Sequence, residues 1–278
     1  MHVLRDLRFV FPATIALIVI IVAVTSPWIA PRSYYEMKLP HKLRPPFWQQ
    51  GGSLEYPLGT DSLGRDVLSR MIGGARISLV ASMLSILIGA VVGISIGVFS
   101  AYRGGAVDTV LMRVCDGFLS FPMILLAMIL AIATGPSMRT VVLAIGLVVW
   151  ARYARVIRSE ALSLKERDFV SYAHMVRCSE LRILMRHMLP NLMGTILVLA
   201  TLQIGWAIVV EASLSFIGAG IPPPQPSWGG MVASGREYIG MAWWLTFFPG
   251  MAIAITVLAF NFLGDWLRDH LDPKLREL

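Results

Sequence analysis

Charge is scarce in this sequence. Charged residues account for 15% of its 278 residues, whereas soluble domains carry roughly 25%. Hydrophobic residues account for 56%, the mean hydropathy is +0.69, and the apolar residues form long uninterrupted runs. A lipid bilayer requires such runs and a soluble core does not. The composition therefore predicts an all-α, polytopic integral membrane protein.

Residues that carry common chemistry are also few. The two cysteines, Cys115 and Cys178, do not form the pattern of a disulfide scaffold. The five histidines are scattered, and no credible Ser/His/Asp set stands out. A G-x-x-x-x-G-K-S/T phosphate loop is missing, so this chain is not expected to hydrolyse ATP. We expect no catalytic residue, no metal and no cofactor in the chain itself.

Positive charge is in excess, with a formal net charge of +7 and a pI of about 9.8. The basic residues border the apolar runs, which favours a role in orienting membrane spans over nucleic-acid binding. Fifteen of the 24 Lys and Arg residues fall on one predicted side, including Lys274 and Arg276 near the C-terminal end. This bias places both termini in the cytoplasm.

Six apolar runs predict six transmembrane helices, and the first is too long for the core of a signal peptide. The fourth run is the shortest, because only residues 140–151 separate Arg139 from Arg152. It still predicts a span, because the Arg139 side chain can reach outward to the headgroups and the Arg152 side chain inward. We divide the chain into residues 1–75, with the first span and an outer amphipathic segment, and a core of residues 76–278. The runs are 9–30, 77–102, 117–133, 140–151, 188–210 and 238–264.

Two outer segments connect these spans. In residues 57–76, Leu63, Val67 and Met71 recur every four residues, which predicts an amphipathic helix capped by Thr60 or Asp61. The second segment, residues 218–237, is stiffened by prolines. Aromatic residues in and after it are expected at a membrane interface: Trp228, Trp243 and Trp244.

The second span carries Gly89, Gly93 and Gly97, four residues apart. Such a face allows another helix to approach closely. The partner helix can belong to this chain or to a second subunit, and packing within the chain is the favoured interpretation.

The cytoplasmic loop, residues 152–187, contains two helical patterns. Phe169, Tyr172, Ala173 and Val176 predict the first helix, and apolar residues from Leu181 to Met188 predict the second. Ser179 is placed to cap the second helix, with Glu180 in its first turn, and Pro190 starts or kinks the next span. The pattern is typical of a rigid helix-turn-helix bracket, although an amphipathic loop lying on lipid headgroups fits it equally well.

Four motifs along the chain resemble those of a known protein family. They are PLGTDSLGRDVLSRMIGGARISL at 57–79, RHMLPN at 186–191, EASLSFIGAGIPPPQPSWGGM at 211–231 and FNFLGDWLRDHLDP at 260–273. Together they resemble the second, or C-type, permease subunits of ABC importers for oligopeptides, dipeptides and nickel. The resemblance implies the type I importer fold with six transmembrane helices, in the cytoplasmic (inner) membrane of a bacterium or archaeon.

The resemblance also implies partners. They are a homologous second permease, two ATPase subunits that bind ATP and Mg²⁺, and an extracytoplasmic substrate-binding protein; the cargo is short peptides or similar small solutes. The cytoplasmic loop would couple ATPase motion to the spans, with Tyr172, Ala173 and Val176 on the gripped face. The residues implied in coupling are Phe169, Ser171, Tyr172, Ala173, Val176, Arg177, Ser179, Glu180, Leu189 and Pro190.

This sequence departs from the family motif in the coupling loop. Ser171, Tyr172 and Ala173 replace the usual Glu-Ala-Ala, and Arg177 replaces the usual glycine. The turn at Arg177 must therefore use an ordinary φ or accept strain.

Residues near the predicted outer side are candidates for the pathway or an outer gate: Glu211, Ser213, Trp228 and Arg236. An acidic residue at the end of a span, such as Glu211, is a functional candidate, and a carboxylate bonded to neighbouring groups is the alternative. A self-sufficient carrier or channel is the alternative function. It is less favoured because the sequence shows no clear internal repeat and few charges in the middle of its spans.

Overall fold

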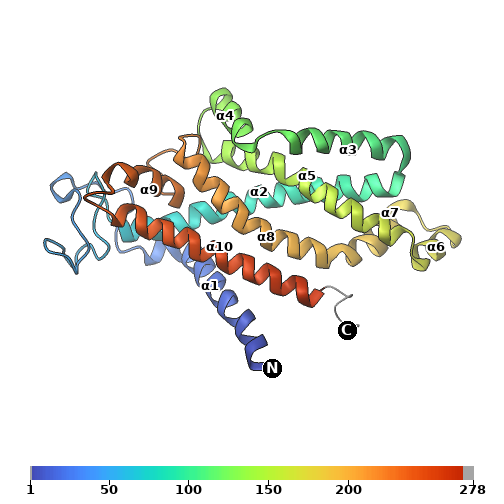
Figure 1. Ribbon diagram of the computed structural model, residues 1–278, viewed down its shortest axis with the longest axis horizontal. Coiled ribbons are helices and arrows are strands. Elements are labelled where there is room, and N and C mark those ends of the chain that lie inside the picture. Colours follow the sequence, from blue (N-terminus) through green and yellow to red (C-terminus); the bar gives the residue numbers. More distant parts are fainter. Residues whose placement is uncertain (1, 272–278) are drawn as a thin grey trace.

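The computed structural model describes residues 2–271, and this part of the chain is built from helices joined by loops (Figure 1). Its only β pairing within the described residues is an isolated bridge between Thr60 and Asp66. The helices are α1 (His2–Ile29), α2 (Val67–Arg103), α3 (Gly105–Ser120), α4 (Met123–Thr134), α5 (Met138–Lys165), α6 (Asp168–Met175), α7 (Glu180–Arg182), α8 (Leu189–Phe216), α9 (Trp228–Gly235) and α10 (Trp244–Leu271). A π-helical segment, Ile183–Met188, and two 3₁₀ segments, Leu39–His41 and Arg236–Tyr238, complete the set.

Length and composition identify five helical segments of the described chain as candidate membrane spans: residues 9–29, α2, α5, the continuous run Glu180–Phe216, and α10. The pair α3 and α4 qualifies as a sixth span only if taken together, because the two helices bend by 85° at their junction. The third predicted span is therefore not one straight helix. Pro122 explains the break, because the residue before a proline avoids helical geometry, and Phe121 is extended with φ −76° and ψ 130°.

Helices α2, α5, α8 and α10 run along one common direction, whereas α1 lies obliquely to them, and the bundle has two distinct ends (Figure 1). We call them the α9 end, which also carries the loop of residues 31–66, and the α6 end, which carries α6 and α7. Helices α2 and α5 form the centre, α8 and α10 pack on one side, α3 and α4 on the other, and α1 crosses α2 and α10. The C-terminal end of α10 points toward the α6 end.

The glycine face of α2 packs against α5 within the chain, as the favoured interpretation predicted. A Cβ on Gly89 would lie 2.5 Å from a methyl carbon of Val149, and one on Gly93 would lie 2.3 Å from the carbonyl oxygen of Trp150. Gly97 meets the carbonyl of Ala154 in the same way. Only a residue without a side chain permits this approach.

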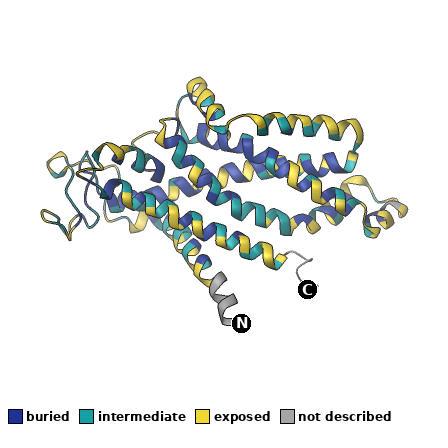
Figure 2. Cartoon of the chain, viewed as in Figure 1, coloured by how far each residue is buried: buried dark blue, intermediate teal, exposed yellow. Residues whose placement is uncertain are grey.

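Helix α5, whose apolar run is the shortest, is the most enclosed of the spans. In its most apolar stretch 72% of the residues are buried, against 22–44% in the other four (Figure 2). A helix surrounded by protein has less need of apolar side chains facing lipid. The Arg152 guanidinium lies 4.0 Å from the centre of the Trp206 ring on α8, so it makes a contact within the bundle, and its reach to the inner headgroups stays a prediction.

The outer segment begins its helix later than expected. Helix α2 starts at Val67, and the side chain of Asp66 caps it by accepting a hydrogen bond from the Ser69 amide at 2.9 Å. The predicted caps, Thr60 and Asp61, and the predicted helical residue Leu63 instead lie in the preceding turns. The helix then continues to Arg103, so the boundary drawn between residues 75 and 76 falls inside α2.

Asp61 explains why the preceding residues form a turn. Its carboxylate accepts hydrogen bonds from the backbone amides of Leu63 and Arg65, each at 2.9 Å, and pairs with the Arg65 guanidinium at 2.7 Å. Such local bonds compete with helix formation. Gly64 has φ +73°, and a Cβ there would stand 1.9 Å from the Lys38 carbonyl oxygen, so this turn packs tightly on the loop before it.

Candidate functional site

The α6 end carries the predicted helix-turn-helix bracket. Helix α6 is followed by a tight turn in which the Val176 amide bonds the Tyr172 carbonyl at 3.1 Å and the Cys178 amide bonds the Ala173 carbonyl at 3.0 Å. Arg177 sits in the turn with φ +55°, a left-handed conformation that favours glycine. Of the two possibilities stated for this position, the chain adopts the strained one.

The second arm of the bracket leads directly into a long span. A continuous helical run extends from Glu180 to Phe216, and it includes the π-helical segment that ends at Met188. Pro190 lies in the first turn of α8. Because proline has no N–H to donate, it interrupts the backbone hydrogen-bond pattern there, and the preceding π-helical segment accommodates the interruption. Ser179 occupies the N-cap position as predicted, but its side chain makes no capping hydrogen bond.

One face of the bracket packs against the bundle. Val170 and Ala173 of α6 are 1% and 6% exposed, and they belong to a buried cluster that includes Ile183 of the second arm. The expectation that Ala173 shares an exposed face with Tyr172 and Val176 is wrong, because the side chain points into the chain's own core. The second arm also contributes Met188, and members of this cluster from the long helices are Val98, Ala101, Ile157, Ala161, Leu164 and Leu192.

The opposite face of the bracket is an exposed apolar ridge. Tyr172, Met175 and Val176 are 63%, 75% and 72% exposed. Phe169 is half-buried beside a shallow depression formed by residues 166–169 and Tyr172. The other implied coupling residues are placed as follows: Ser171, Arg177, Ser179, Glu180 and Pro190 are exposed, and Leu189 is half-buried. Three large apolar side chains, on α6 and the residue after it, form a surface suited to a protein partner.

Polar contacts fasten the bracket to α2. The Lys165 ammonium group, at the end of α5, donates to the carbonyls of Ala101 and Tyr102 at 3.2 and 2.7 Å, which satisfies the C-terminal end of α2. Arg103 pairs with Glu180 at 3.5 Å across the exposed surface. The bracket is thus held to α2 by the Arg103–Glu180 pair and is continuous with α8, and α5, which leads into it, is held to α2 by Lys165.

At the α9 end, Glu211 lies at the centre of a buried hydrogen-bond network. Its carboxylate is 0% exposed and accepts hydrogen bonds from the hydroxyls of Ser78 at 3.0 Å and Ser215 at 2.8 Å. The Trp228 amide donates to the Ser78 hydroxyl at 3.2 Å, which links α9 to α2 and α8. The carboxylate is bonded to neighbouring groups, so in this conformation the structure matches the alternative interpretation of Glu211.

The remaining outer candidates are divided between core and surface. Trp228 and Trp244 are each 3% exposed, so the expectation that they sit at a membrane interface is wrong; their indole N–H groups donate to the carbonyls of Met71 and Thr60. Ser213 is half-buried and donates to the Val209 carbonyl one turn earlier. Arg236 is exposed, with its guanidinium 5.1 Å from the Phe216 ring centre.

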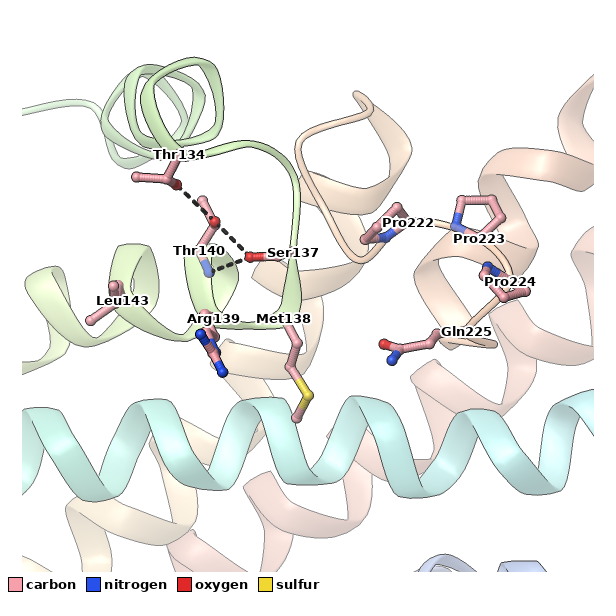
Figure 3. A pocket seen from close by; sticks show the side chains of 10 residues that line it. All are labelled: Thr134, Ser137, Met138, Arg139, Thr140, Leu143, Pro222, Pro223, Pro224 and Gln225. Atoms are coloured by element: carbon pink, nitrogen blue, oxygen red, sulfur yellow. Dashed lines mark hydrogen bonds between the residues drawn. The ribbon is translucent and has the colours of Figure 1, made fainter.

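A cavity at the N-terminal end of α5 was not predicted as a site. It lies between the α4–α5 turn and residues 222–225 and includes Arg139 and Gln225 (Figure 3). The one available signal was Arg139 itself, a charge at the edge of an apolar run. From sequence alone that charge predicts a side chain reaching for the headgroups, because the sequence does not show that residues 222–225 lie opposite.

The arrangement of membrane-length helices is that of a type I ABC importer permease. It matches the permease fold of the MetNI methionine ABC transporter in an inward-facing conformation, with a TM-score of 0.60 over 73% of this chain and 96% of that chain. The two sequences are 16% identical, so this similarity concerns the fold alone.

The family follows from the sequence comparison. Residues 89–277 match the family described as "Binding-protein-dependent transport system inner membrane component", and the chain belongs to this family. It is 41% identical to a putative peptide transport system permease protein of Brucella abortus, over 99% of this chain and 90% of that protein. It is 40% identical to the di/tripeptide transport system permease protein DppC of Pseudomonas aeruginosa, over 94% of this chain and 86% of that protein. It is 39% identical to the glutathione transport system permease protein GsiD of Escherichia coli, over 95% of this chain and 86% of that protein.

Proposed function

We propose that this protein is one of two permease subunits in a binding-protein-dependent ABC importer of short peptides or similar small solutes. The support for the cargo is the set of relatives at 39–41% identity, whose names refer to peptides, di/tripeptides and glutathione. The partners are a homologous second permease, two ATPase subunits that bind ATP and Mg²⁺, and an extracytoplasmic substrate-binding protein.

The exposed apolar ridge of Tyr172, Met175 and Val176 carries the proposal for energy coupling. An ATPase subunit grips this ridge, and closure of the two ATPase subunits moves the bracket. Ala173 supports the ridge from within, because it is buried against the chain's own core. The alternative, a ridge that lies on lipid headgroups, predicts that ATPase binding is insensitive to charges introduced there.

In the proposed orientation the α6 end and both termini are cytoplasmic, and the α9 end faces outward. There, residues 218–237, including exposed Arg236, together with residues 57–76 that pack against them, help form the surface that receives the binding protein or closes the outer gate. Single cysteines at exposed Glu166 and Ser234, in a background with Cys115→Ala and Cys178→Ala, test this in intact cells. An impermeant thiol reagent should label position 234 and spare position 166, and the reverse pattern contradicts the orientation.

Reconstitution tests the function itself. The subunit should co-purify with a second permease and an ATPase, and proteoliposomes with this complex should take up dipeptide only with ATP and the binding protein. Uptake by this chain alone, driven by an ion gradient, would instead support the self-sufficient carrier.

A further inference from the structure

The cavity at the N-terminal end of α5 is large enough for a small solute. Its volume is about 720 Å³, and it is open on one side. Figure 3 shows one wall formed by residues 134–143, which join the end of α4 to the start of α5, and the other by Pro222, Pro223, Pro224 and Gln225. Prolines have a fixed φ, so the second wall is stiff before any ligand arrives.

The cavity has one charged group. Of its ten lining residues, only Arg139 carries a charge. Arg139 is exposed, and within residues 2–271 its guanidinium has no ion pair. The N-terminal end of the 28-residue helix α5 adds positive potential at the same place. The cavity therefore attracts anions.

The hydroxyl groups nearby are already used to hold the wall. The Thr140 hydroxyl lies 3.0 Å from that of Thr134 and 2.9 Å from that of Ser137, and it donates to the Gly135 carbonyl at 2.8 Å (Figure 3). Ser137 also caps α5 by accepting from the Thr140 amide. Arg139 and Gln225 are left as the groups available to a ligand, on opposite walls with Met138 between them.

We propose that this cavity binds the carboxylate of a transported short peptide, with the Arg139 guanidinium as its counter-ion and the Gln225 amide as a second donor. This inference rests on the proposed function. A guanidinium presents a planar pair of N–H donors that matches a carboxylate, and it stays charged at any physiological pH. Met138, Leu143 and the three prolines give apolar contact to the rest of the solute, which suits a carrier of varied side chains.

The test uses the assembled complex, with dialanine and its C-terminal amide as probes, each at a concentration that saturates the binding protein. Arg139→Gln should lower uptake of dialanine roughly tenfold, which corresponds to about 1.4 kcal/mol, and leave uptake of the amide at the wild-type value. Arg139→Lys keeps the charge without the planar pair of N–H donors. Its uptake of dialanine should lie between that of the wild type and that of Arg139→Gln. Gln225→Leu should lower dialanine uptake in the same direction. Lys42→Gln removes an exposed charge at the same end of the molecule, outside this cavity. It should change the uptake of neither probe.

Two results would overturn the proposal. Equal loss of both probes in Arg139→Gln would show that Arg139 serves folding or a lipid headgroup, and unchanged uptake of both would show that the cavity does not meet the carboxylate. Failure of the underlying function is distinguishable, because the wild-type complex would then show no ATP-dependent uptake of dialanine at all.

Discussion

Gly93 on α2 lies against Trp150 on α5 so closely that a Cβ on Gly93 would stand 2.3 Å from the Trp150 carbonyl oxygen. A backbone oxygen cannot swing aside as a flexible side chain can. Gly93→Ala should therefore push the two helices apart and destabilise the protein by roughly 1–3 kcal/mol, the usual cost of overpacking. Membrane abundance and the thermal stability of the solubilised complex measure the effect.

Gly117→Ala is the matched control for that change. Gly117 lies within α3 and a Cβ there would meet nothing within 4 Å. Alanine favours helix by up to about 1 kcal/mol over glycine, so this variant should be neutral or more stable. Equal loss in both variants would contradict the packing explanation for the α2 glycines.

Arg177→Gly should stabilise the bracket. Arg177 is exposed and has φ +55°, which costs a non-glycine residue roughly 1–2 kcal/mol. Glycine removes that cost, although part of the gain is offset by its greater freedom in the unfolded chain. We expect a small rise in thermal stability with uptake retained, measured on the assembled complex.

A β-branched residue at the same position gives the opposite expectation. Arg177→Val removes the same charge and adds steric conflict at positive φ, so it should lower stability. If the glycine and valine variants behave alike, the effect at this position is due to the charge rather than to the backbone.

Val176→Asp and Ala173→Asp should fail in different ways. Val176 is 72% exposed on the ridge, so an aspartate there should leave membrane abundance normal while it weakens ATPase association and abolishes uptake. Ala173 is 6% exposed in an apolar cluster, so an aspartate there should reduce abundance itself. Quantitative blotting, ATPase co-purification and uptake separate the two effects.

Tyr172→Asp is a second test of the ridge, because Tyr172 is also exposed. Normal ATPase association and uptake in both ridge variants would contradict docking at this surface. Normal abundance of Ala173→Asp would contradict the packing of α6 described above.

Glu211→Ala should destabilise the α9 end. The change leaves the hydroxyls of Ser78 and Ser215 without their shared acceptor in a buried site, which costs roughly 1–3 kcal/mol for each unpaired group. Glu211→Gln keeps the shape and one acceptor oxygen, so its effect should be smaller. Limited proteolysis of the 218–237 segment and thermal stability measure the loss.

Glu180→Gln is the control for loss of a carboxylate. Its contact with Arg103 is exposed, and exposed pairs contribute roughly 0–1 kcal/mol. A loss of stability as large as that of Glu211→Ala would contradict the importance given to burial at Glu211.

Apolar runs predict four of the five long spans well because lipid imposes hydrophobicity on every exposed face, whereas enclosed α5 shows only a short run. The third run is harder to interpret: it carries no charge throughout, and only Pro122 signals that the chain turns sharply there. The apolar face of α6 was found from spacing, but spacing alone could not assign Ala173 to the inner face, because that depends on where Ile183 and Met188 of the second arm pack.

The α9 end shows a second limit of prediction from sequence. The tightly packed network of Glu211 joins α2, α8 and α9, whose residues are up to 150 positions apart in the chain. No periodicity within one segment encodes such a contact. The same holds for the cavity, whose two walls come from residues 134–143 and 222–225.

Helix α5 begins beside the cavity, with its cap at Ser137, and ends at Lys165 beside the bracket. Its 28 residues span ~42 Å at ~1.5 Å per residue. A stiff rod of that length has a simple geometry: a tilt of ~5° about the cavity end carries Lys165 sideways by roughly 4 Å. Conversely, a push of a few ångströms on the bracket changes the angle of α5 at the cavity by only a few degrees. Under the proposed coupling, a movement of a few ångströms at the bracket would thus reach the cavity wall that carries Arg139 as a small change in angle.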